Sequence, residues 1–258
     1  MPRKPRIEIA GYYHIINRGV EQRVVFQDVE DCEYFEELMC FYAKSYGITI
    51  HNYCLMNNHY HLLIEITKET LSKFMRQLNM NYAIYFNKKY KRSGHLWQGR
   101  FKSWYVTDEA YLYTLMLYIE QNPLKAGIVQ ELEEYPFSSY HYFINPAQIP
   151  ECLKNSWVVE HYQDNVDEIK AFMNSSVDAS QLEEMKKAAS LVEAPNREKS
   201  PTELAAELQS LFSKAKDKQE RNKLVLQVYE QGYSQHMIAK VLGITQQAVH
   251  GIIKRGRK

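Results

Sequence analysis

The chain has 258 residues, which is enough for one sizeable hydrophobic core and a second, smaller domain. Its hydrophobic fraction of 45% is ordinary for a globular protein, and no apolar run is long enough to span a bilayer. We therefore expect no membrane partner and a cytoplasmic, nucleoid-associated location. The cysteines show no CxxC spacing, so we expect reduced thiols rather than a disulfide framework or a zinc site at Cys32, Cys40, Cys54 and Cys152.

The net charge of +1 conceals a strong segregation of charge along the chain. Residues 68–105 contain nine Lys and Arg residues against one acid, and residues 213–258 contain ten basic residues against three acidic ones. Residues 130–195 reverse the balance, with twelve acidic residues and four lysines. Two basic regions on either side of an acidic one predict two surfaces that face nucleic acid, although either could be an ordinary solvated surface.

The first half of the chain predicts a strand, a helix, two strands, a basic amphipathic helix, a strand and a tyrosine-rich helix, in this order: residues 12–17, 28–46, 48–55, 59–66, 71–90, 99–106 and 111–123. Asp28 is a plausible N-cap of the first helix, and Gly47 ends it. Pro123 ends the last helix, because the residue before a proline is pushed out of the helical region. This order predicts an α+β, ferredoxin-like fold with an antiparallel sheet and helices on one face.

His59 and His61 are separated by one residue within a predicted strand. Residues i and i+2 of a strand point to the same face, so both imidazoles should project together from the sheet. The pair offers two nitrogen ligands to a divalent metal ion. The alternative is that two histidines merely share a sheet face.

Tyr118 and Asn122 are four residues apart in the predicted tyrosine-rich helix, so they share one helical face. Presented to the two-histidine strand, the phenol and the carboxamide would complete a site with three metal ligands and a nucleophile. Because the chain has 20 tyrosines, Tyr118 could instead be a packing residue at the edge of the core.

Four stretches, in this order along the chain, resemble the single-tyrosine HUH transposases, and most closely the REP-associated tyrosine transposases: residues 13–19 (YHIINRG), 55–61 (LMNNHYH), 94–102 (GHLWQGRFK) and 118–123 (YIEQNP). The resemblance covers about residues 10–143 and implies the ferredoxin-like HUH fold for a catalytic domain over residues 1–150. One departure is Tyr60, which stands where the family usually has a bulky aliphatic residue. We expect Tyr60 to point to the opposite, core-packing face.

The resemblance implies that Tyr118 attacks a phosphate of single-stranded DNA and leaves a 5′-phosphotyrosine and a free 3′-OH. His59, His61 and Asn122 would hold Mg²⁺ or Mn²⁺, and their mixed nitrogen and oxygen donors suit Mn²⁺ somewhat better. The predicted function is metal-dependent nicking and strand transfer on hairpins and REP-like repeats, by a monomer or a homodimer. Two alternatives stay open: a DNA-binding regulator with an inactive catalytic fold, and a metal-dependent phosphodiesterase that uses water.

Basic and aromatic residues at the end of the basic helix, and in the segment that follows it, are candidates for clamping single-stranded DNA. They are Lys88, Lys89, Lys91, Arg92, His95, Trp97, Arg100 and Lys102. Trp97 could instead belong to the core.

Residues 151–221 predict a helical acidic spacer, and residues 222–258 predict an all-α helix-turn-helix domain that docks on duplex DNA. Ala239 allows a close helix crossing, Gly243 supplies the tight turn, and Thr245 caps the second helix. An ordinary helical hairpin has a similar periodicity but lacks this placement of glycine and alanine beside a basic tail. The expected DNA contacts come from Gln246, Gln247, His250, Lys254 and Arg255, followed by Arg257 and Lys258.

Overall fold

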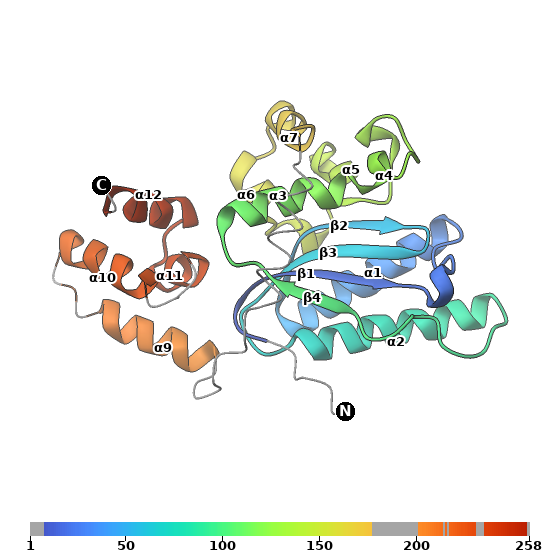
Figure 1. The fold of residues 1–258 in the computed structure, drawn as a ribbon, viewed down its shortest axis with the longest axis horizontal. Helices are drawn as coiled ribbons and strands as arrows, with labels where there is room; N and C mark the ends of the chain where they lie inside the picture. The colour runs from blue at the N-terminus through green and yellow to red at the C-terminus, as the bar shows by residue number, and fades with distance from the viewer. Residues whose placement is uncertain (1–7, 177–200, 214, 216, 231–234, 257–258) are drawn as a thin grey trace. The chain divides into compact units, whose positions relative to one another are not determined.

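The computed structural model describes residues 8–176, 201–213, 215, 217–230 and 235–256. It divides into two units, one with a four-stranded sheet and the helices from α1 to α7, the other with the helices from α9 to α12 (Figure 1). The first unit contains β1 (Gly11–Arg18), α1 (Val29–Tyr46), β2 (Ile48–Met56), β3 (His59–Ile66), α2 (Leu71–Lys89), β4 (Lys102–Tyr105), α3 (Glu109–Glu120), α4 (Asn122–Lys125), α5 (Ser139–Phe143), α6 (Trp157–Tyr162) and α7 (Val166–Met173). Short 3₁₀ turns lie at Val20–Gln22, Leu132–Glu134, Pro146–Gln148 and Glu151–Leu153. The second unit contains α9 (Pro201–Phe212), α10 (Lys218–Glu230), α11 (Gln235–Leu242) and α12 (Gln246–Gly256).

The strands of the sheet lie in the order β2-β3-β1-β4. β2 pairs antiparallel with β3, and β1 pairs antiparallel with β4. β1 and β3 also run antiparallel, because the Gly19 amide after β1 donates to Asn58 just before β3, whereas His14 earlier in β1 lies beside His61 later in β3. The predicted α+β class and antiparallel sheet are confirmed.

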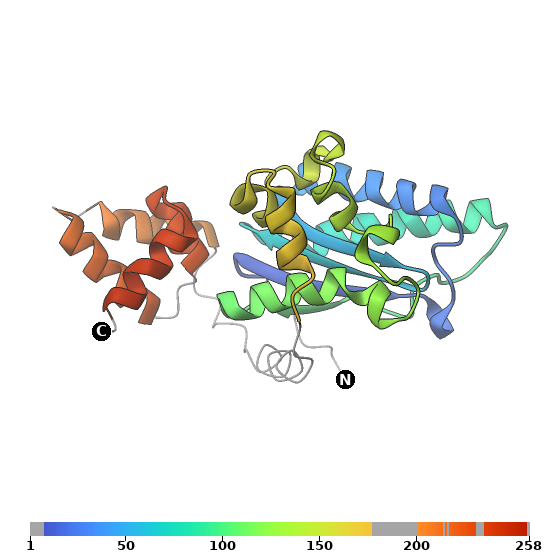
Figure 2. The same cartoon turned by 90° about the horizontal axis from the view of Figure 1, so that it is seen from above.

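Helices cover both faces of the sheet, so the prediction that they lie on one face was wrong (Figure 2). Tyr60 of β3 has its ring centroid 4.8 Å from that of Phe35 in α1, and its hydroxyl donates to Asn79 of α2 over 2.7 Å. The next residue, His61, points the other way and contacts Tyr118 of α3. β3 is buried along nearly its whole length, so each of its faces requires a covering layer.

Local signals set the ends of the helices that frame the sheet. The side chain of Asp28 accepts from the Asp31 amide at the start of α1, and Gly47 ends α1 with φ of 64° in the left-handed region. Asp108 caps α3 in the same way, by accepting from the Tyr111 amide. α3 ends at Glu120, and Pro123 lies in the first turn of the short helix α4, which begins at Asn122. The residue before Pro123 is therefore helical, contrary to expectation, and the break between the two helices falls at Gln121. The last predicted strand, residues 99–106, is shorter in the structure, where β4 spans Lys102–Tyr105.

The prediction of four reduced cysteines was wrong for one pair. Cys40 of α1 and Cys152 of a 3₁₀ turn form a disulfide, with their Cα atoms 5.1 Å apart. They are 112 residues apart in sequence, so no local spacing could reveal the pairing. Cys32 and Cys54 are buried free thiols, as predicted.

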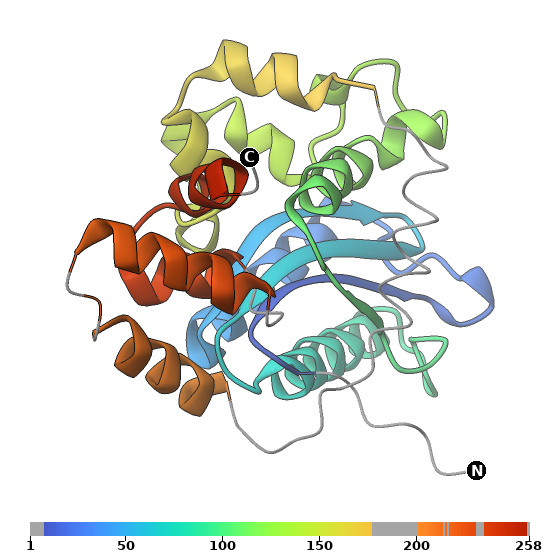
Figure 3. The same ribbon diagram turned by 60° about the vertical axis from the view of Figure 1, so that its left-hand side comes forward.

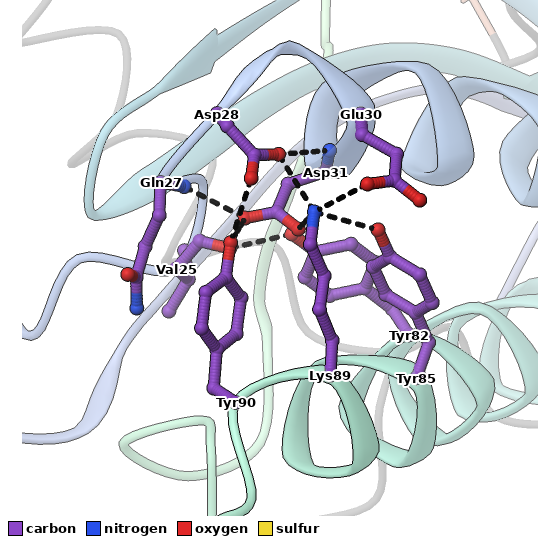
Figure 4. A network of polar contacts seen from close by, with 9 residues as sticks. All are labelled: Val25, Gln27, Asp28, Glu30, Asp31, Tyr82, Tyr85, Lys89 and Tyr90. Atoms are coloured by element: carbon purple, nitrogen blue, oxygen red, sulfur yellow. Dashed lines mark hydrogen bonds and ion pairs between the residues drawn. The ribbon is translucent and has the colours of Figure 1, made fainter.

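A polar network joins the start of α1 to the end of α2 (Figure 4). Lys89 Nζ lies 2.8, 3.0 and 2.9 Å from carboxylate oxygens of Asp28, Glu30 and Asp31. Asp31 is fully buried and also accepts from the Tyr90 hydroxyl at 2.8 Å. Lys89 therefore compensates a buried carboxylate, whose partner is costly to remove.

The second unit has a hydrophobic core of its own, built from all its helices (Figure 3). This core contains Leu208, Phe212, Val225, Val228, Ile238, Ala239, Val249, Ile252 and Ile253. In contrast, α6 and α7 pack on the core of the first unit through Val158, Ile169 and Met173. The domain boundaries expected at residues 150 and 221 stay predictions. None of the helices in the described ranges is long and apolar enough to cross a membrane.

Candidate active site

His59 and His61 project from β3 toward α3, with their ring centroids 5.0 Å apart. Each ring uses its Nδ1 in a hydrogen bond, His59 with Asn58 Oδ1 at 2.7 Å and His61 with His14 Nε2 at 3.0 Å. Nε2 is therefore the nitrogen of each ring that a metal ion would take. Burial and, to a smaller extent, the charge of Arg18 lower the pKa of His59, which favours the neutral, metal-binding form.

Tyr118 lies in the last turn of α3, over the histidines. Its ring centroid is 5.6 Å from that of His61 and 6.1 Å from that of His14, and it meets both rings edge to face. Tyr118 is half-buried, whereas its helix neighbours Leu117 and Ile119 are buried. The structure thus brings the predicted nucleophile and both predicted histidines into one cluster.

A buried carboxyl group anchors the end of α3 that carries Tyr118. Glu120 accepts hydrogen bonds from Asn52 Nδ2 and the Tyr140 amide, each at 3.2 Å, and from the Ser139 hydroxyl. Asn52 also donates to the carbonyl of Met116 at 3.1 Å, so α3 is tied to β2 and α5. Burial raises the pKa of Glu120 to about 7, against the opposing effect of these hydrogen bonds.

Asn122 follows α3 directly, and its amide turns back on that helix. Its Nδ2 donates to the carbonyls of Tyr118 at 2.7 Å and Ile119 at 3.3 Å. Asn122 is thereby linked to Tyr118 rather than to either histidine, and its Oδ1 is the atom that could serve a metal ion.

Three exposed cationic side chains lie on the same face of the sheet as the histidines. Arg18 shares a strand face with His14, and Lys102 pairs with Ile16 two residues beyond His14, so both project toward this side. Lys125 of α4 places its Nζ 5.0 Å from the ring centroid of Tyr118. Positive charge beside a potential nucleophile favours an anionic substrate.

His14 is not among the site residues expected from the sequence, yet the structure makes it a buried neighbour of His61. It also missed Trp104, which pairs with His14 across β1 and β4 and has its ring centroid 5.4 Å from it. The roles of Arg18 and Lys125 were missed as well. The period of two along β1 could have aligned His14 with Arg18, but the contact with His61 depends on how β1 pairs with β3.

The donors present fit a divalent ion held by two imidazoles and one amide. Within the described ranges, no cluster of three or more His, Cys, Asp or Glu side chains could hold a metal ion. A metal at this site would therefore need a third ligand of another type, such as the Asn122 amide oxygen. The Nδ1 hydrogen bonds of both histidines match the way in which metal-binding imidazoles are held in proteins.

The predicted single-strand clamp separates into two groups of residues. Lys89 belongs to the α1–α2 network, and Trp97 packs on Tyr60 and donates to the Asn79 carbonyl at 2.9 Å on the α1–α2 side, so both have structural roles. Arg92 rests on the Phe86 ring. The exposed members, which stay predicted DNA contacts, are Lys88, Lys91, His95, Arg100 and Lys102.

The segment that follows α2 runs beside the end of β1 that carries Arg18. The amide of Val20 donates to the carbonyl of Leu96, and the amide of Gln98 donates to the carbonyl of Arg18, each at 2.9 Å. The basic segment is thereby held next to the strand that carries His14 and Arg18.

In the second unit, α11 and α12 are joined by the expected short turn. Gly243 has φ of 63°, and Thr245 Oγ1 accepts from the Ala248 amide at 3.2 Å. Exposed positions along α12 include Gln247, His250, Lys254 and Arg255. The side chain of Gln246, and Arg257 and Lys258, lie outside the described residues. DNA contact by this surface stays a prediction.

Comparison with known proteins links the sheet unit to DNA transposition. Residues 9–122 match the family described as "Transposase IS200 like". The chain is 28% identical, over 148 residues, to a protein of Haemophilus influenzae described as a REP-associated tyrosine transposase, covering 50% of this chain and 82% of that protein.

Two solved structures are also similar. A REP-associated tyrosine transposase bound to a REP hairpin shares 18% identity and a TM-score of 0.48, covering 58% of this chain and 89% of the other. A protein from Deinococcus radiodurans R1, described as a transposase, shares 20% identity and a TM-score of 0.34, covering 47% and 97%. The matched residues 9–122 contain the two histidines, Tyr118 and Asn122, so the candidate site lies wholly within the part of the chain that is similar to IS200-like transposases.

Proposed function

We propose that this protein is a transposase that nicks and rejoins single-stranded DNA through a covalent bond to Tyr118. The observation that carries the proposal is the contact between the Tyr118 ring and His61, with His59 beside it. A phenol next to two imidazoles and three cationic side chains can serve as the nucleophile of a phosphoryl transfer.

The chemistry balances as a transesterification. Tyr118 Oη forms a bond to phosphorus, and the bond from phosphorus to the 3′ oxygen breaks. The phenol proton is lost and the leaving oxygen gains one, so the products are a 5′-phosphotyrosine and a free 3′-OH. Because one phosphoester replaces another, a second 3′-OH can reverse the step and join a new strand.

His59, His61 and Asn122 would hold a divalent ion, Mg²⁺ or Mn²⁺. When bound, this ion would act as a Lewis acid on the scissile phosphate. Arg18, Lys102 and Lys125 would offset the negative charge of the phosphate and its neighbours. Trp104, exposed in part beside His14, would stack against an unpaired base.

The relative from Haemophilus influenzae is described as a REP-associated tyrosine transposase, and we propose hairpins in REP-like repeats as the target of this chain. The exposed basic residues of the segment after α2 would follow the single strand. The exposed side chains of α12, Gln247, His250, Lys254 and Arg255, would contact a duplex stem.

Covalent trapping tests the proposal. The wild-type protein, incubated with Mn²⁺ and an end-labelled single strand containing a hairpin, should give a protein–DNA adduct on a denaturing gel. Tyr118→Phe should lose the adduct and keep DNA binding. Tyr113→Phe is the matched control, because Tyr113 lies on the same helix and donates to Glu109 instead.

Three other outcomes of the trapping experiment would contradict the proposal. Free DNA ends without an adduct would indicate a phosphodiesterase that uses water. Shifted bands without cleavage would indicate a DNA-binding regulator. An undiminished adduct with Tyr118→Phe would assign the nucleophile to another tyrosine.

A further inference from the structure

His14 makes a direct side-chain contact with one of the proposed metal ligands. Its Nε2 lies 3.0 Å from His61 Nδ1, and its side chain is fully buried. The two rings are inclined by only 16°, with centroids 5.3 Å apart, which is the separation of imidazoles joined nitrogen to nitrogen at their edges. The contact is therefore a hydrogen bond in the plane of both rings.

A hydrogen bond between two neutral imidazoles constrains both tautomers. Each neutral ring has one donor and one acceptor nitrogen, so either His61 donates from Nδ1 or it accepts there. Only when His61 donates does its Nε2 carry the lone pair that a metal ion requires. The direction of this one bond decides whether His61 can be a ligand.

We propose that His14 is a positioning residue that accepts the Nδ1 proton of His61 and so holds the His61 Nε2 ready to bind a metal ion. The proposal rests on the metal-binding role of His61 given above. His59 has the corresponding arrangement, because its Nδ1 faces Asn58 Oδ1, an amide oxygen that can only accept. Both proposed ligands then present Nε2.

The charge of the side chain that accepts the His61 Nδ1 proton affects the electrostatic potential of the site. A carboxylate is a common partner of metal-binding histidines, and it would bring a negative charge close to the substrate phosphate. A neutral imidazole fixes the tautomer without that charge. The positive charges of Arg18, Lys102 and Lys125 on this face then remain available to the DNA.

Neighbouring groups hold His14 in place. Trp104 pairs with it across β1 and β4, with ring centroids 5.4 Å apart, and Tyr118 packs edge to face against it from α3. Because His14 and His61 come from adjacent strands, the sheet itself sets the distance between the two nitrogens.

Two substitutions separate the hydrogen bond from simple packing. His14→Phe keeps an aromatic ring but has no acceptor, whereas His14→Gln keeps an acceptor at a similar reach. His141→Phe, in α5, controls for the loss of a histidine elsewhere. The readouts are the ¹⁵N NMR signals of the histidine side chains in the metal-free protein and the affinity for Mn²⁺ measured by electron paramagnetic resonance.

In the metal-free wild type and in His14→Gln, His61 should carry its proton on Nδ1. In His14→Phe that proton should move to Nε2, and the affinity for Mn²⁺ should fall by about tenfold or more. The control should match the wild type in both measurements.

Two results would overturn the proposal: a wild-type His61 that carries its proton on Nε2, or a folded His14→Phe with unchanged tautomer and unchanged Mn²⁺ affinity. The NMR signal of the wild type decides the direction of the bond even if His14→Phe does not fold. Failure of the proposed function would appear differently, as a wild-type protein that forms no covalent adduct.

Discussion

The two faces of the sheet differ in what they bury, although they are formed by alternate residues of the same strands. Toward α1 and α2, Tyr60 meets Phe35, which in turn meets Tyr82, in a fully buried aromatic cluster. Toward α3, the sequence neighbours of Tyr60, His59 and His61, lie side by side, and His61 meets the half-buried Tyr118. Lys125 lies against the Tyr118 ring. The α1–α2 face is a packing surface, and the α3 face carries the candidate catalytic residues. Successive residues of β3 alternate between the two faces.

This division means that stability and activity should respond to different substitutions. The α1–α2 face combines apolar burial with the Lys89 network, so it should dominate the free energy of unfolding. The α3 face buries polar side chains such as His14 and His61, which costs stability and is useful only for binding and catalysis.

The largest expected effect falls on the α3 face. His59→Ala or His61→Ala should lower the rate of adduct formation by about a thousandfold or more, because the proposed metal ion loses a ligand. Excess EDTA should do the same to the wild type. Asn122→Ala should lose less, since water can replace a neutral amide ligand. Covalent trapping measures all three, and full cleavage in excess EDTA would remove the metal from the mechanism.

Substitutions on the α1–α2 face should lower the free energy of unfolding rather than the activity. Tyr60→Ala should lower the free energy of unfolding by about 3 kcal/mol, because it leaves a cavity between the sheet and α1. The molecules that remain folded should still form the adduct. Tyr60→Phe, which loses only the hydrogen bond to Asn79, should cost about 1 kcal/mol. Urea unfolding measures both variants, and a loss of activity without a loss of stability would contradict the division between the faces.

A smaller effect is expected from the pH dependence of the free energy of unfolding, through Glu120 at the end of α3. Its pKa is raised from 4.5 to about 7 by burial, so the folded state binds the proton more tightly than the unfolded state does. This contribution to stability is complete below about pH 4.5 and is lost as the pH rises through about 7. Glu120→Gln should therefore flatten the fall in stability between pH 5 and pH 8, by roughly 2 kcal/mol.

Urea unfolding at several pH values checks this. Glu36 has a pKa raised to about 7 by burial as well, so a fall in stability with pH should persist in Glu120→Gln and become smaller in the double variant with Glu36→Gln. A Glu120→Gln curve parallel to that of the wild type would show that Glu120 is ionised alike in the folded and unfolded states.

The smallest effect concerns the second unit, whose exposed α12 should act separately from both faces of the sheet. Replacing Lys254 and Arg255 together by alanine should weaken duplex binding several-fold and reduce the slope of log affinity against log salt by about 2, while single-strand cleavage persists. Lys218→Ala with Lys223→Ala, on α10, is the matched control. Equal salt slopes in all three proteins would indicate that α12 does not contact DNA.

Short-range signals were sufficient to predict much of the fold. The strand at His59–Ile66 and the Asp28 and Gly47 boundaries of α1 follow from periodicity and capping, which involve residues a few positions apart. The common face of His59 and His61, and the core-facing Tyr60, follow from the same period of two.

Partners far apart in sequence were decided by the tertiary structure. His14 meets His61 across 47 residues because β1 lies beside β3 in the sheet. Lys89 looked like a DNA contact from its charge alone, until folding placed it on buried Asp31. Strand pairing and helix packing depend on the whole core, so the sequence alone determined which side chains share a face, and only the assembled sheet decided which of them touch.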